Sequence, residues 1–295
     1  MDEDQIARVR RFNRAVSRRI GALDDRFLAR GRPLGQARLL FEAGQERDGA
    51  AVRALRARLG LDAGYTSRLL RALEDQGLVT VVPDPGDRRV RRVVLTARGR
   101  REVAELDRRA EGFARGLLAA LDPPRRARLV AAMDEVDRLM RAAAVRLDRV
   151  PPADPDVRHC FGCYFHELAD RFDAGFDPAR SISAADHELT PPAGLVVVAR
   201  LDGRPLGCGA LKVGRDGIGE VKRMWVDGAA RGLGLGRRIL ARLEDLARGA
   251  GLRTLRLETN RNLTRAIALY RSSGYVEVSA FNDEPYAHHW FEKAL

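Results

Sequence analysis

One stretch constrains the fold of this chain more than any other, residues 219–238, which read GEVKRMWVDGAARGLGLGRR. It begins with a strand-like alternation up to Val226, and glycines then occupy every second position from Gly232 to Gly236 before an amphipathic helix. Glycines between a strand and a helix start let a ligand approach the backbone closely and leave amide N–H groups unpaired. Because a helix N-terminus carries partial positive charge, the loop predicts a binding site for phosphate groups.

The spacing of these glycines does not fit the dinucleotide-binding motif G-x-G-x-x-G, and the Gly-Lys-Ser/Thr end of a P-loop is absent. The pattern R-x-x-G-x-G over 231–236 instead resembles the pyrophosphate loop of the GNAT N-acetyltransferases. Further matches, LETN, ALY and GY, follow in the family's order between 257 and 275. The resemblance covers about residues 157–295 and implies an α/β GNAT fold, a central mixed sheet flanked by helices.

The GNAT resemblance implies that acetyl-CoA is the co-substrate and that a neutral amine attacks its thioester directly. In the family, main-chain groups of the strand before the loop bind pantetheine, and amides of the loop bind the pyrophosphate. The candidate acetyl-CoA-binding residues are therefore Met224, Trp225, Val226, Arg231, Gly232, Leu233, Gly234, Leu235, Gly236, Arg237 and Asn262.

The candidate catalytic residues are a tyrosine and two glutamates. Tyr270 stands at the family's tyrosine position, which implies that it protonates the departing CoA sulfur; a core aromatic on a helix face is the alternative. Glu220, at the head of the central strand, is the first candidate for the base, through a water molecule, and Glu258 is the second. Either glutamate can instead be a solvated charge at a strand end. The same resemblance places the acceptor amine near Tyr164, Glu167, Arg171, Asn282 and Tyr286.

Cys160 and Cys163 lie beside His159 and His166, a set that invites a zinc site. A second cysteine pair is missing and the segment has helical apolar spacing, so buried, inert cysteines and no metal are expected. The chain has 3 cysteines, which suits a reducing cytoplasm better than a disulfide framework. It has no run of eighteen apolar residues, and its start, MDEDQIARVRR, predicts neither a membrane span nor a signal peptide.

The positive charge is concentrated in one half of the sequence. Residues 1–150 carry 33 Arg against 22 Asp and Glu, whereas residues 151–295 carry 20 Lys and Arg against 19 Asp and Glu. An arginine-rich genome would not by itself confine the excess to one half. The asymmetry therefore predicts a polyanion partner, nucleic acid, for residues 1–150.

The basic half contains a helix-turn-helix pattern followed by a hairpin. Residues 50–59 predict a short helix, and Asp62 is a suitable cap for a second one over 63–76. Two β-rich runs, 78–82 and 90–95, enclose a charged tip. This arrangement resembles the winged helix of the MarR family of transcription regulators, whose wing arginine enters the minor groove of DNA. The candidate DNA-binding residues are Tyr65, Thr66, Arg68 and Arg71, expected to face outward, and Asp87, Arg88, Arg89 and Arg91 of the wing.

Three long helices are expected around this module, at 4–30, 97–120 and 124–148. The first includes Ile20, Leu23 and Phe27 in its apolar stripe. Together they resemble the MarR dimerisation region, although their apolar rows fit an intramolecular core equally well. The resemblance implies a homodimer on a roughly palindromic site in double-stranded DNA.

These observations predict a mainly α winged helix-turn-helix domain at 1–149, a stiff proline-rich linker at 150–156 and a GNAT domain at 157–295. The expected function is that of a bifunctional bacterial transcriptional regulator and N-acetyltransferase in the cytoplasm. Two alternatives remain open: a transcription factor whose GNAT domain only senses acetyl-CoA, and an acetyltransferase whose winged helix serves dimerisation.

Overall fold

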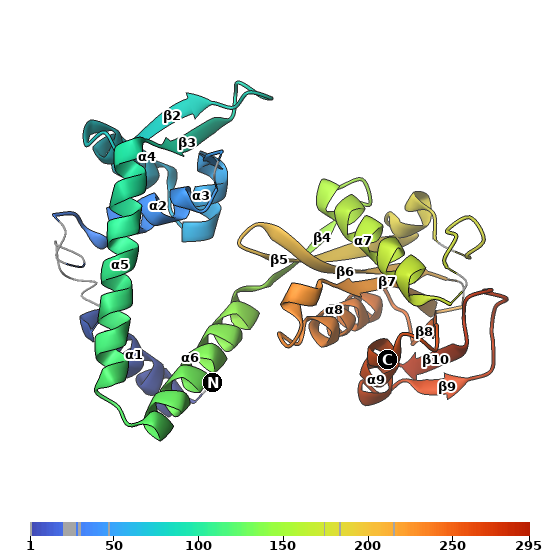
Figure 1. Ribbon diagram of the computed structural model, residues 1–295. Coiled ribbons are helices and arrows are strands. Elements are labelled where there is room, and N and C mark those ends of the chain that lie inside the picture. The colour runs from blue at the N-terminus through green and yellow to red at the C-terminus, as the bar shows by residue number, and fades with distance from the viewer. Residues whose placement is uncertain are drawn as a thin grey trace. The chain divides into compact units, whose positions relative to one another are not determined.

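The computed structural model describes residues 2–19, 28, 31–46, 48–173, 175–182, 184–214 and 216–295 (Figure 1). The contacts within the chain divide it into two compact units, Met1–Val130 and Ala131–Leu295. Each unit has a buried apolar core of its own. Both fold classes expected from the sequence are confirmed, since the first unit is mainly helical with a small sheet and the second is a mixed α/β sheet.

The first unit combines helices with a three-stranded antiparallel sheet in the order β1-β3-β2. Buried leucines of four helices and Val93 of the central strand form its core. The elements are α1 (Glu3–Arg19), α2 (Leu34–Gly44), β1 (Ala50–Ala51), α3 (Val52–Leu59), α4 (Ala63–Asp75), β2 (Val79–Pro83), β3 (Arg91–Leu95), α5 (Ala97–Ala119) and the start of α6 (Pro123–Ala144).

Local signals fix the helix-turn-helix. Gly60 adopts the left-handed conformation that ends α3, at φ 63°. The Asp62 side chain then accepts a hydrogen bond from the Tyr65 amide at 2.8 Å and caps α4. Thr96 caps α5 in the same way, and its hydroxyl also donates to the Gly77 carbonyl at 2.7 Å. The hairpin β2–β3 is thereby tied at its base to the end of α4.

The second unit is built on a seven-stranded sheet in the order β4-β5-β6-β7-β8-β10-β9, in which only the recorded pairing of β7 with β8 is parallel. Its elements are β4 (Arg146–Val150), α7 (Pro155–Arg171), the short 3-10 helix η2 (Asp186–Leu189), β5 (Gly194–Leu201), β6 (Arg204–Val213), β7 (Ile218–Val226), the short 3-10 helix η3 (Gly228–Ala230), α8 (Leu235–Gly249), β8 (Thr254–Thr259), α9 (Thr264–Ser272), β9 (Val276–Val278) and β10 (His289–Ala294).

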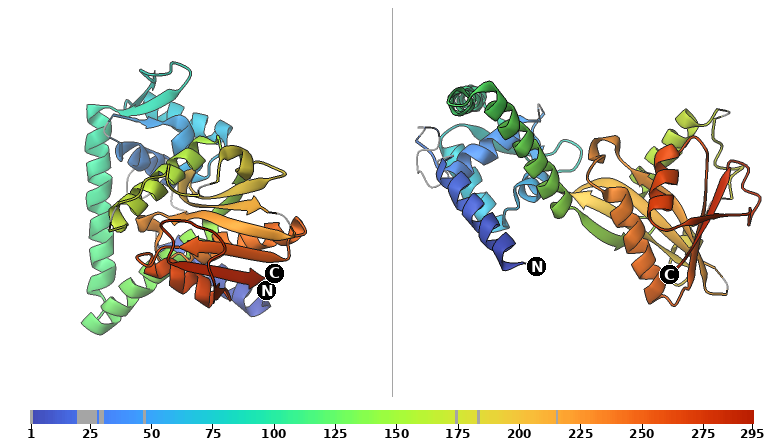
Figure 2. Two further views of the ribbon diagram at one scale, coloured as in Figure 1. Left: turned by 90° about the vertical axis from the view of Figure 1, so that its right-hand side faces the viewer. Right: turned by 90° about the horizontal axis from the view of Figure 1, so that it is seen from below.

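Helices cover both faces of this sheet (Figure 2). Along β5, Val196 and Val198 pack with α7 in one core, whereas Val197 and Ala199 pack with α8 and α9 in another. Successive strand residues point to opposite faces, so a strand covered on both sides is apolar throughout. This explains the continuous run of apolar residues in β5.

The structure corrects two expectations about the middle of the chain. The helix expected to reach residue 148 ends at Ala144, and Arg146–Val150 forms β4, which pairs antiparallel with β5. The expected linker at 150–156 is also folded, because Val150 ends β4 and the Asp154 side chain caps α7. The cause is tertiary: Val145 is buried in the core of the second unit, and Arg238 of α8 donates to its carbonyl at 2.8 Å.

The first helix is described as far as Arg19, and the expected stripe residues Ile20, Leu23 and Phe27 lie outside the described residues. The short helix expected at 50–59 begins instead with the two-residue strand β1, and the remaining elements differ from expectation by a few residues at their ends.

The parallel pairing of β7 with β8 is confined to the starts of both strands. It covers Ile218–Glu220 of β7 and Thr254–Arg256 of β8, although the strands continue to Val226 and Thr259. On its other side β7 is bulged, since Ala210 of β6 faces Lys222 but Cys208 faces Trp225, and Arg223 takes a positive φ of 52°. Residues beyond the end of this ladder line two adjoining cavities.

Candidate functional site

The larger cavity, of about 630 Å³, lies at the N-terminus of α8. Gly234 is the N-cap of that helix, with φ 68°, and Gly232 has φ 82°, so two of the three loop glycines adopt conformations that other residues rarely take. The first amides of α8 have no carbonyl one turn earlier in the helix to bind. The predicted anion-binding geometry is therefore present beside a cavity of ligand size.

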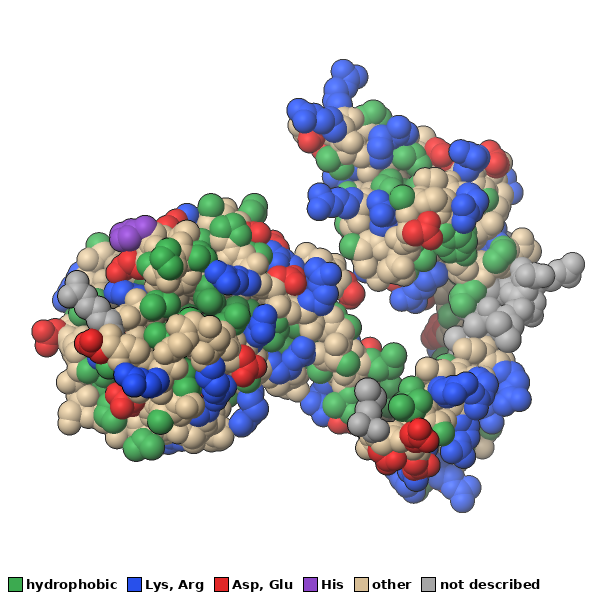
Figure 3. All heavy atoms as spheres, turned by 180° about the vertical axis from the view of Figure 1, so that it is seen from behind, with side chains coloured by type: hydrophobic (Ala, Val, Ile, Leu, Met, Phe, Trp, Pro, Cys, Tyr) green, Lys and Arg blue, Asp and Glu red, His purple; other side chains and the backbone are tan. Residues whose placement is uncertain are grey.

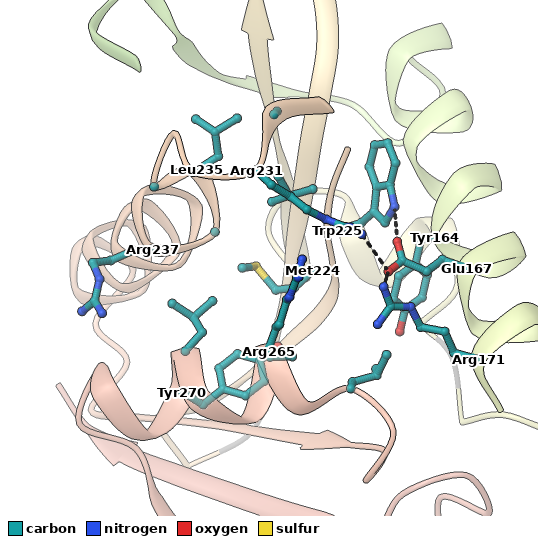
Figure 4. Close-up of a pocket in the computed structure, with 18 of the residues that line it drawn as sticks. Tyr164, Glu167, Arg171, Met224, Trp225, Arg231, Leu235, Arg237, Arg265 and Tyr270 are labelled. Atoms are coloured by element: carbon teal, nitrogen blue, oxygen red, sulfur yellow. Dashed lines mark hydrogen bonds and ion pairs between the residues drawn. The ribbon is translucent and has the colours of Figure 1, made fainter. Parts of the chain in front are cut away.

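Most of the predicted acetyl-CoA-binding residues line this larger cavity (Figure 4): Met224, Trp225, Val226, Arg231, Gly232, Gly234, Leu235, Gly236 and Arg237. Leu233 does not, because its side chain is buried in the core below the loop. Asn262 is also outside the lining; its amide donates to the Arg171 carbonyl at 2.8 Å and to Asp173 Oδ1 at 3.2 Å. The Arg237 side chain turns away to donate to Ser272 Oγ at 2.9 Å, which leaves its main chain facing the cavity.

Glu167 of α7 organises one wall of the larger cavity (Figure 4). Its Oε2 accepts a hydrogen bond from Trp225 Nε1 at 3.0 Å, and its Oε1 lies 2.7 Å from Arg171 and 3.9 Å from Arg231. Glu167 and Arg171 were expected to bind the acceptor amine. The structure places both against the larger cavity, where they hold the indole and the first arginine of the loop.

Two tyrosines, Tyr164 and Tyr270, line both the larger cavity and an adjoining one of about 90 Å³. Burial raises the pKa of each well above its ordinary value, because the phenolate would lose its hydration, and nearby charge including that of Glu258 adds to the effect on Tyr270. Both hydroxyls are therefore protonated at neutral pH. A tyrosine in this position can donate a proton to a group in either cavity.

The smaller cavity has a largely aromatic wall. Phe176 lies 5.8 Å from both Phe165 and Phe172, measured between ring centroids, and 4.9 Å from Tyr286. All four rings belong to the lining of this cavity; the sequence placed Tyr286 near the acceptor amine. Asn282, also expected near the acceptor, lies elsewhere, and its Oδ1 accepts a hydrogen bond from Trp290 Nε1 at 2.8 Å.

The two glutamates differ in how they relate to the cavities. Lys222 Nζ lies 3.1 Å from Glu220 Oε2 and 2.5 Å from Glu258 Oε1. Glu220 is also paired with Arg256 at 2.8 Å and is absent from the described lining of both cavities. Glu258 lines the smaller cavity, and its buried Oε2 has no hydrogen-bond partner among the described residues.

Burial alone would raise the pKa of Glu220, but the hydrogen bond from Arg256 and the charge of Lys222 outweigh it and hold that pKa below its ordinary value. Burial would likewise lower the pKa of Lys222, and the two carboxylates raise it above its ordinary value. Glu220 is therefore an occupied ion-pair partner, a poor proton acceptor in the fold.

The sequence-based reasoning missed several lining residues. Arg265 lines the larger cavity, and Phe165, Phe172, Phe176, Lys222, Arg223 and Glu284 line the smaller one. The three phenylalanines carried a usable signal, because they lie within twelve residues of a chain that is only 6% aromatic. Arg223 had no recognisable signal in the sequence, because its side chain lines the cavity as a result of the bulge in β7. Its guanidinium lies 4.4 Å from the centre of the Phe161 ring.

The three cysteines are free. Cys160 and Cys208 are buried between α7 and the sheet, and Cys163 Sγ lies 3.8 Å from His159 Nε2. Within the described part of the chain, no three His, Cys, Asp or Glu side chains are grouped as metal ligands would be. The described helices also include none that is long and apolar enough to cross a bilayer.

In the first unit, Tyr65, Arg68 and Arg71 are exposed on α4, with the Arg68 guanidinium 5.7 Å from the centre of the Tyr65 ring. Thr66 corrects the expectation, since it is only 1% exposed and cannot reach a partner. Its hydroxyl donates to the Asp62 carbonyl at 2.7 Å, which satisfies the polar group inside the core.

The hairpin tip gathers arginines on its surface (Figure 3). Arg88, Arg89 and Arg91 are exposed, and the Arg89 side chain is 94% exposed with Nε 3.9 Å from Asp87 Oδ1. Arg92 differs from them, because it pairs with Asp84 at 2.8 Å and also donates to the Gly49 carbonyl. Arg91 also donates to the Val81 carbonyl of the opposite strand at 3.2 Å. Arg91 and Arg92 thus both stabilise the hairpin, while Arg88 and Arg89 are available to a partner.

The comparisons with known proteins agree with this geometry. The model of the acetyltransferase (GNAT) family matches residues 130–275, and that of the MarR family matches residues 30–90. The chain is similar to an "IAA acetyltransferase" of Azospirillum brasilense, 44% identical over 39% of this chain and 76% of that protein. It is 31% identical to a mycothiol acetyltransferase of Thermomonospora curvata over 82% of this chain and 90% of that protein.

Among solved structures, a MarR-family transcriptional regulator from Rhodococcus sp. RHA1 is 21% identical, with a TM-score of 0.38 over 46% of this chain and 94% of that one. The family matches and the curated relatives carry the assignment: the chain belongs to the GNAT family, as an acetyl-CoA-dependent N-acetyltransferase that carries a MarR-family domain ahead of its GNAT domain.

Proposed function

We propose that this protein both acetylates a primary amine and regulates transcription, binding double-stranded DNA as a homodimer through its MarR-family domain. The observation that carries the enzymatic half is the meeting of the two cavities at Tyr270, which separates a phosphate-binding end from an aromatic end. DNA and acetyl-CoA are both found in the bacterial cytoplasm, and we place the protein there.

In the larger cavity, we assign the pyrophosphate to the amides at the start of α8 and the pantetheine arm to the main chain of 224–226. Acetyl-CoA supplies the thioester that the amine attacks. The amine nitrogen forms a bond to the acetyl carbon, the carbon–sulfur bond breaks, and the Tyr270 hydroxyl gives its proton to the departing thiolate. The raised pKa of Tyr270 keeps this proton in place until the thiolate forms.

For the base we favour Glu258 over Glu220. Its Oε2 is buried, lacks a partner among the described residues and belongs to a side chain that lines the smaller cavity. A lone pair in that position can take the proton that the attacking nitrogen loses, directly or through one water molecule. Lys222, bound to the other oxygen, keeps the carboxylate oriented.

The smaller cavity supports an acceptor whose amine is attached to a flat apolar or aromatic body. The wall formed by Phe165, Phe172, Phe176 and Tyr286 offers stacking and edge contacts to such a group. Glu284 is not free to pair with a second ammonium group, since Oε2 accepts hydrogen bonds from Ser181 Oγ at 3.0 Å and the Ile182 amide at 2.6 Å.

Exposed apolar stripes on the long helices support a homodimer. α1 exposes Ile6, Val9, Phe12 and Val16, and α6 exposes Val130, Met133, Val136, Leu139 and Met140, each between 36% and 63%. Their three- and four-residue spacing gives one apolar face per helix, which a second copy of the chain would cover. Two copies related by a two-fold axis would present two α4 helices to a palindromic DNA site.

The test is to incubate the full-length protein with acetyl-CoA and a panel of amines, with and without DNA from a selection of random duplexes. We expect turnover with arylalkylamines well above that with small hydrophilic amines, and enrichment of a palindromic sequence. Turnover that favours hydrophilic amines would refute the proposed acceptor class. Absence of any enriched sequence would refute the regulatory half.

A further inference from the structure

A residue outside the strand–loop–helix holds the pyrophosphate loop in place. Arg138 Nη1 donates a hydrogen bond to the Gly232 carbonyl at 2.8 Å, and Arg138 belongs to α6. Its Cδ lies 4.0 Å from the position that a Cβ at Gly232 would take. Gly232 is the first glycine of the loop that lines the acetyl-CoA cavity, whereas Arg138 is not part of that lining. The contact can therefore fix the position of the loop without touching the ligand.

The guanidinium of Arg138 is oriented before it reaches the loop. Glu135, three residues earlier on the same helix, accepts from Arg138 Nε at 2.9 Å and from Nη2 at 2.5 Å. The hydrogen bond and charge of Glu135 raise the pKa of Arg138 above its ordinary value. A guanidinium held on two sides by a carboxylate presents its remaining N–H groups in a fixed direction.

A second contact joins the same two helices. Arg238, in the first turn of α8, donates to the carbonyls of Ala142 and Val145, at the end of α6 and just beyond it. The N-terminal turn of α8, which carries the phosphate-binding amides, is thus fixed against the last turn of α6. Arg138 does the same for the start of the loop.

We propose that Arg138 is a positioning residue for acetyl-CoA and that its contact couples loop occupancy to α6. A loop with three glycines loses much conformational freedom when it closes on a ligand, and a preformed anchor reduces that cost. The anchor therefore strengthens acetyl-CoA binding without touching the reacting atoms.

The coupling follows from the course of α6, which runs without a break from Pro123 to Ala144 and so crosses from the first unit into the second at Val130. A ligand that orders the loop also orders the carbonyl to which Arg138 is bound. By linkage, whatever acetyl-CoA does to DNA affinity, DNA does to acetyl-CoA affinity by the same factor. This second part rests on the proposed DNA-binding function, whereas the positioning role does not.

The experiment uses the full-length protein and three variants: Arg138→Ala, Arg138→Lys and the control Arg141→Ala, an exposed arginine of the last turn of α6. Calorimetry gives the Kd of acetyl-CoA, and steady-state kinetics separate KM from kcat. We expect Arg138→Ala to raise Kd and KM about 3- to 10-fold, the range of one hydrogen bond of ordinary strength, with kcat at saturation unchanged. Arg138→Lys should recover part of the loss, and Arg141→Ala should match the parent.

DNA affinity is then measured for the same proteins with and without acetyl-CoA, in the absence of an amine. In the parent and in Arg141→Ala we expect acetyl-CoA to change the Kd for DNA, and in Arg138→Ala that change should shrink. Equal Kd values for acetyl-CoA in Arg138→Ala and Arg141→Ala would overturn the positioning role. If acetyl-CoA does not change the Kd of the parent protein for DNA, the coupling is overturned. If the parent protein binds no DNA, both the coupling and the regulatory half of the proposed function are overturned.

Discussion

The indole Nε1 of Trp225 donates a hydrogen bond to Glu167 Oε2 at 3.0 Å, which joins the bulged strand β7 to α7 at the wall of the larger cavity. Trp225 is almost fully buried, and this carboxylate oxygen satisfies its N–H inside the fold. The other oxygen of the same carboxylate pairs with Arg171. One side chain thus satisfies a buried donor and neutralises a cation beside the cavity.

Glu167→Ala should therefore destabilise the fold by about 1–3 kcal/mol, the cost of leaving a buried donor unsatisfied. Glu167→Gln should be milder, because its amide oxygen can still accept from the indole. Asp170→Ala is the matched control on the same helix, since Asp170 is exposed and contacts only the exposed His166 among the described residues. Urea unfolding of the full chain measures the difference, and equal losses for Glu167→Ala and Asp170→Ala would contradict it.

Tyr270→Phe should lower kcat by about 10²- to 10⁴-fold and leave the Kd of acetyl-CoA unchanged, because a proton donor to the thiolate acts in the transition state. Tyr275→Phe is the control, since the Tyr275 ring packs 6.0 Å from that of Tyr270 and belongs to neither cavity lining. Because burial raises the pKa of Tyr270, its hydroxyl should also stay protonated beyond about pH 10, the ordinary pKa of tyrosine. If the two variants lose the same fraction of activity, Tyr270 is a packing residue.

The two glutamates should respond differently to removal of their charge. Glu258→Gln should lower kcat/KM by about 10²-fold or more if Glu258 is the base, with little change in the Kd of acetyl-CoA. Glu220→Gln should leave kcat/KM within a few-fold of the parent, because Glu220 lies outside the described cavity linings. Steady-state kinetics with a saturating amine compare the two variants. A larger loss of kcat/KM in Glu220→Gln than in Glu258→Gln would identify Glu220 as the base.

Glu220 should instead contribute to stability in a way that depends on pH. The pKa of Glu220 lies below its ordinary value in the fold, so its ion pairs add stability above the unfolded-state pKa, and that contribution is lost as pH falls through the folded-state pKa. The parent should therefore be more stable than Glu220→Gln at pH 7, and the gap should close in acid below about pH 4. Denaturant midpoints at several pH values test this; a gap that is constant with pH would rule it out.

On DNA, Arg89→Ala should weaken binding to all sequences and reduce the slope of log Kd against log salt by about 1, because an exposed arginine at the tip meets phosphate or the minor groove. Arg68→Ala, on the exposed side of α4, should also relax sequence preference. Arg92→Ala should act through hairpin stability, since Arg92 is held by Asp84. Titrations at two salt concentrations separate these effects, and an unchanged slope in Arg89→Ala would remove the wing from the interface.

The conformation of the glycine loop before α8 and the helix-turn-helix could be predicted because their signals are local. Glycine spacing, a helix cap at Asp62 and the left-handed Gly60 act within a few residues. Thr66 was mispredicted although it lies in the same segment. Its bond to the carbonyl four residues earlier lets a polar side chain be buried, which the apolar stripe alone does not indicate.

The choice between Glu220 and Glu258 could not be made from the sequence. Which charged side chain reaches a cavity depends on where the β7–β8 ladder stops, and that point is set by the bulge and by packing across the sheet. The strand β4 was missed for a similar reason. Its residues fit a helical spacing as well as a strand, and the partner strand β5, about fifty residues away, decides the outcome.

The pairing of β4 with β5 determines where the chain can be truncated to give the second unit alone. A cut at residue 150, where the proline-rich segment suggests a natural boundary, would remove an edge strand and bare the main-chain donors and acceptors of β5. β5 is apolar on both faces, so the fragment starting at residue 151 would expose an apolar edge strand. Such a strand can pair with a strand of another molecule and lead to aggregation. The catalytic unit is therefore best excised from residue 131 onward, with the last turns of α6 retained as its first structural layer.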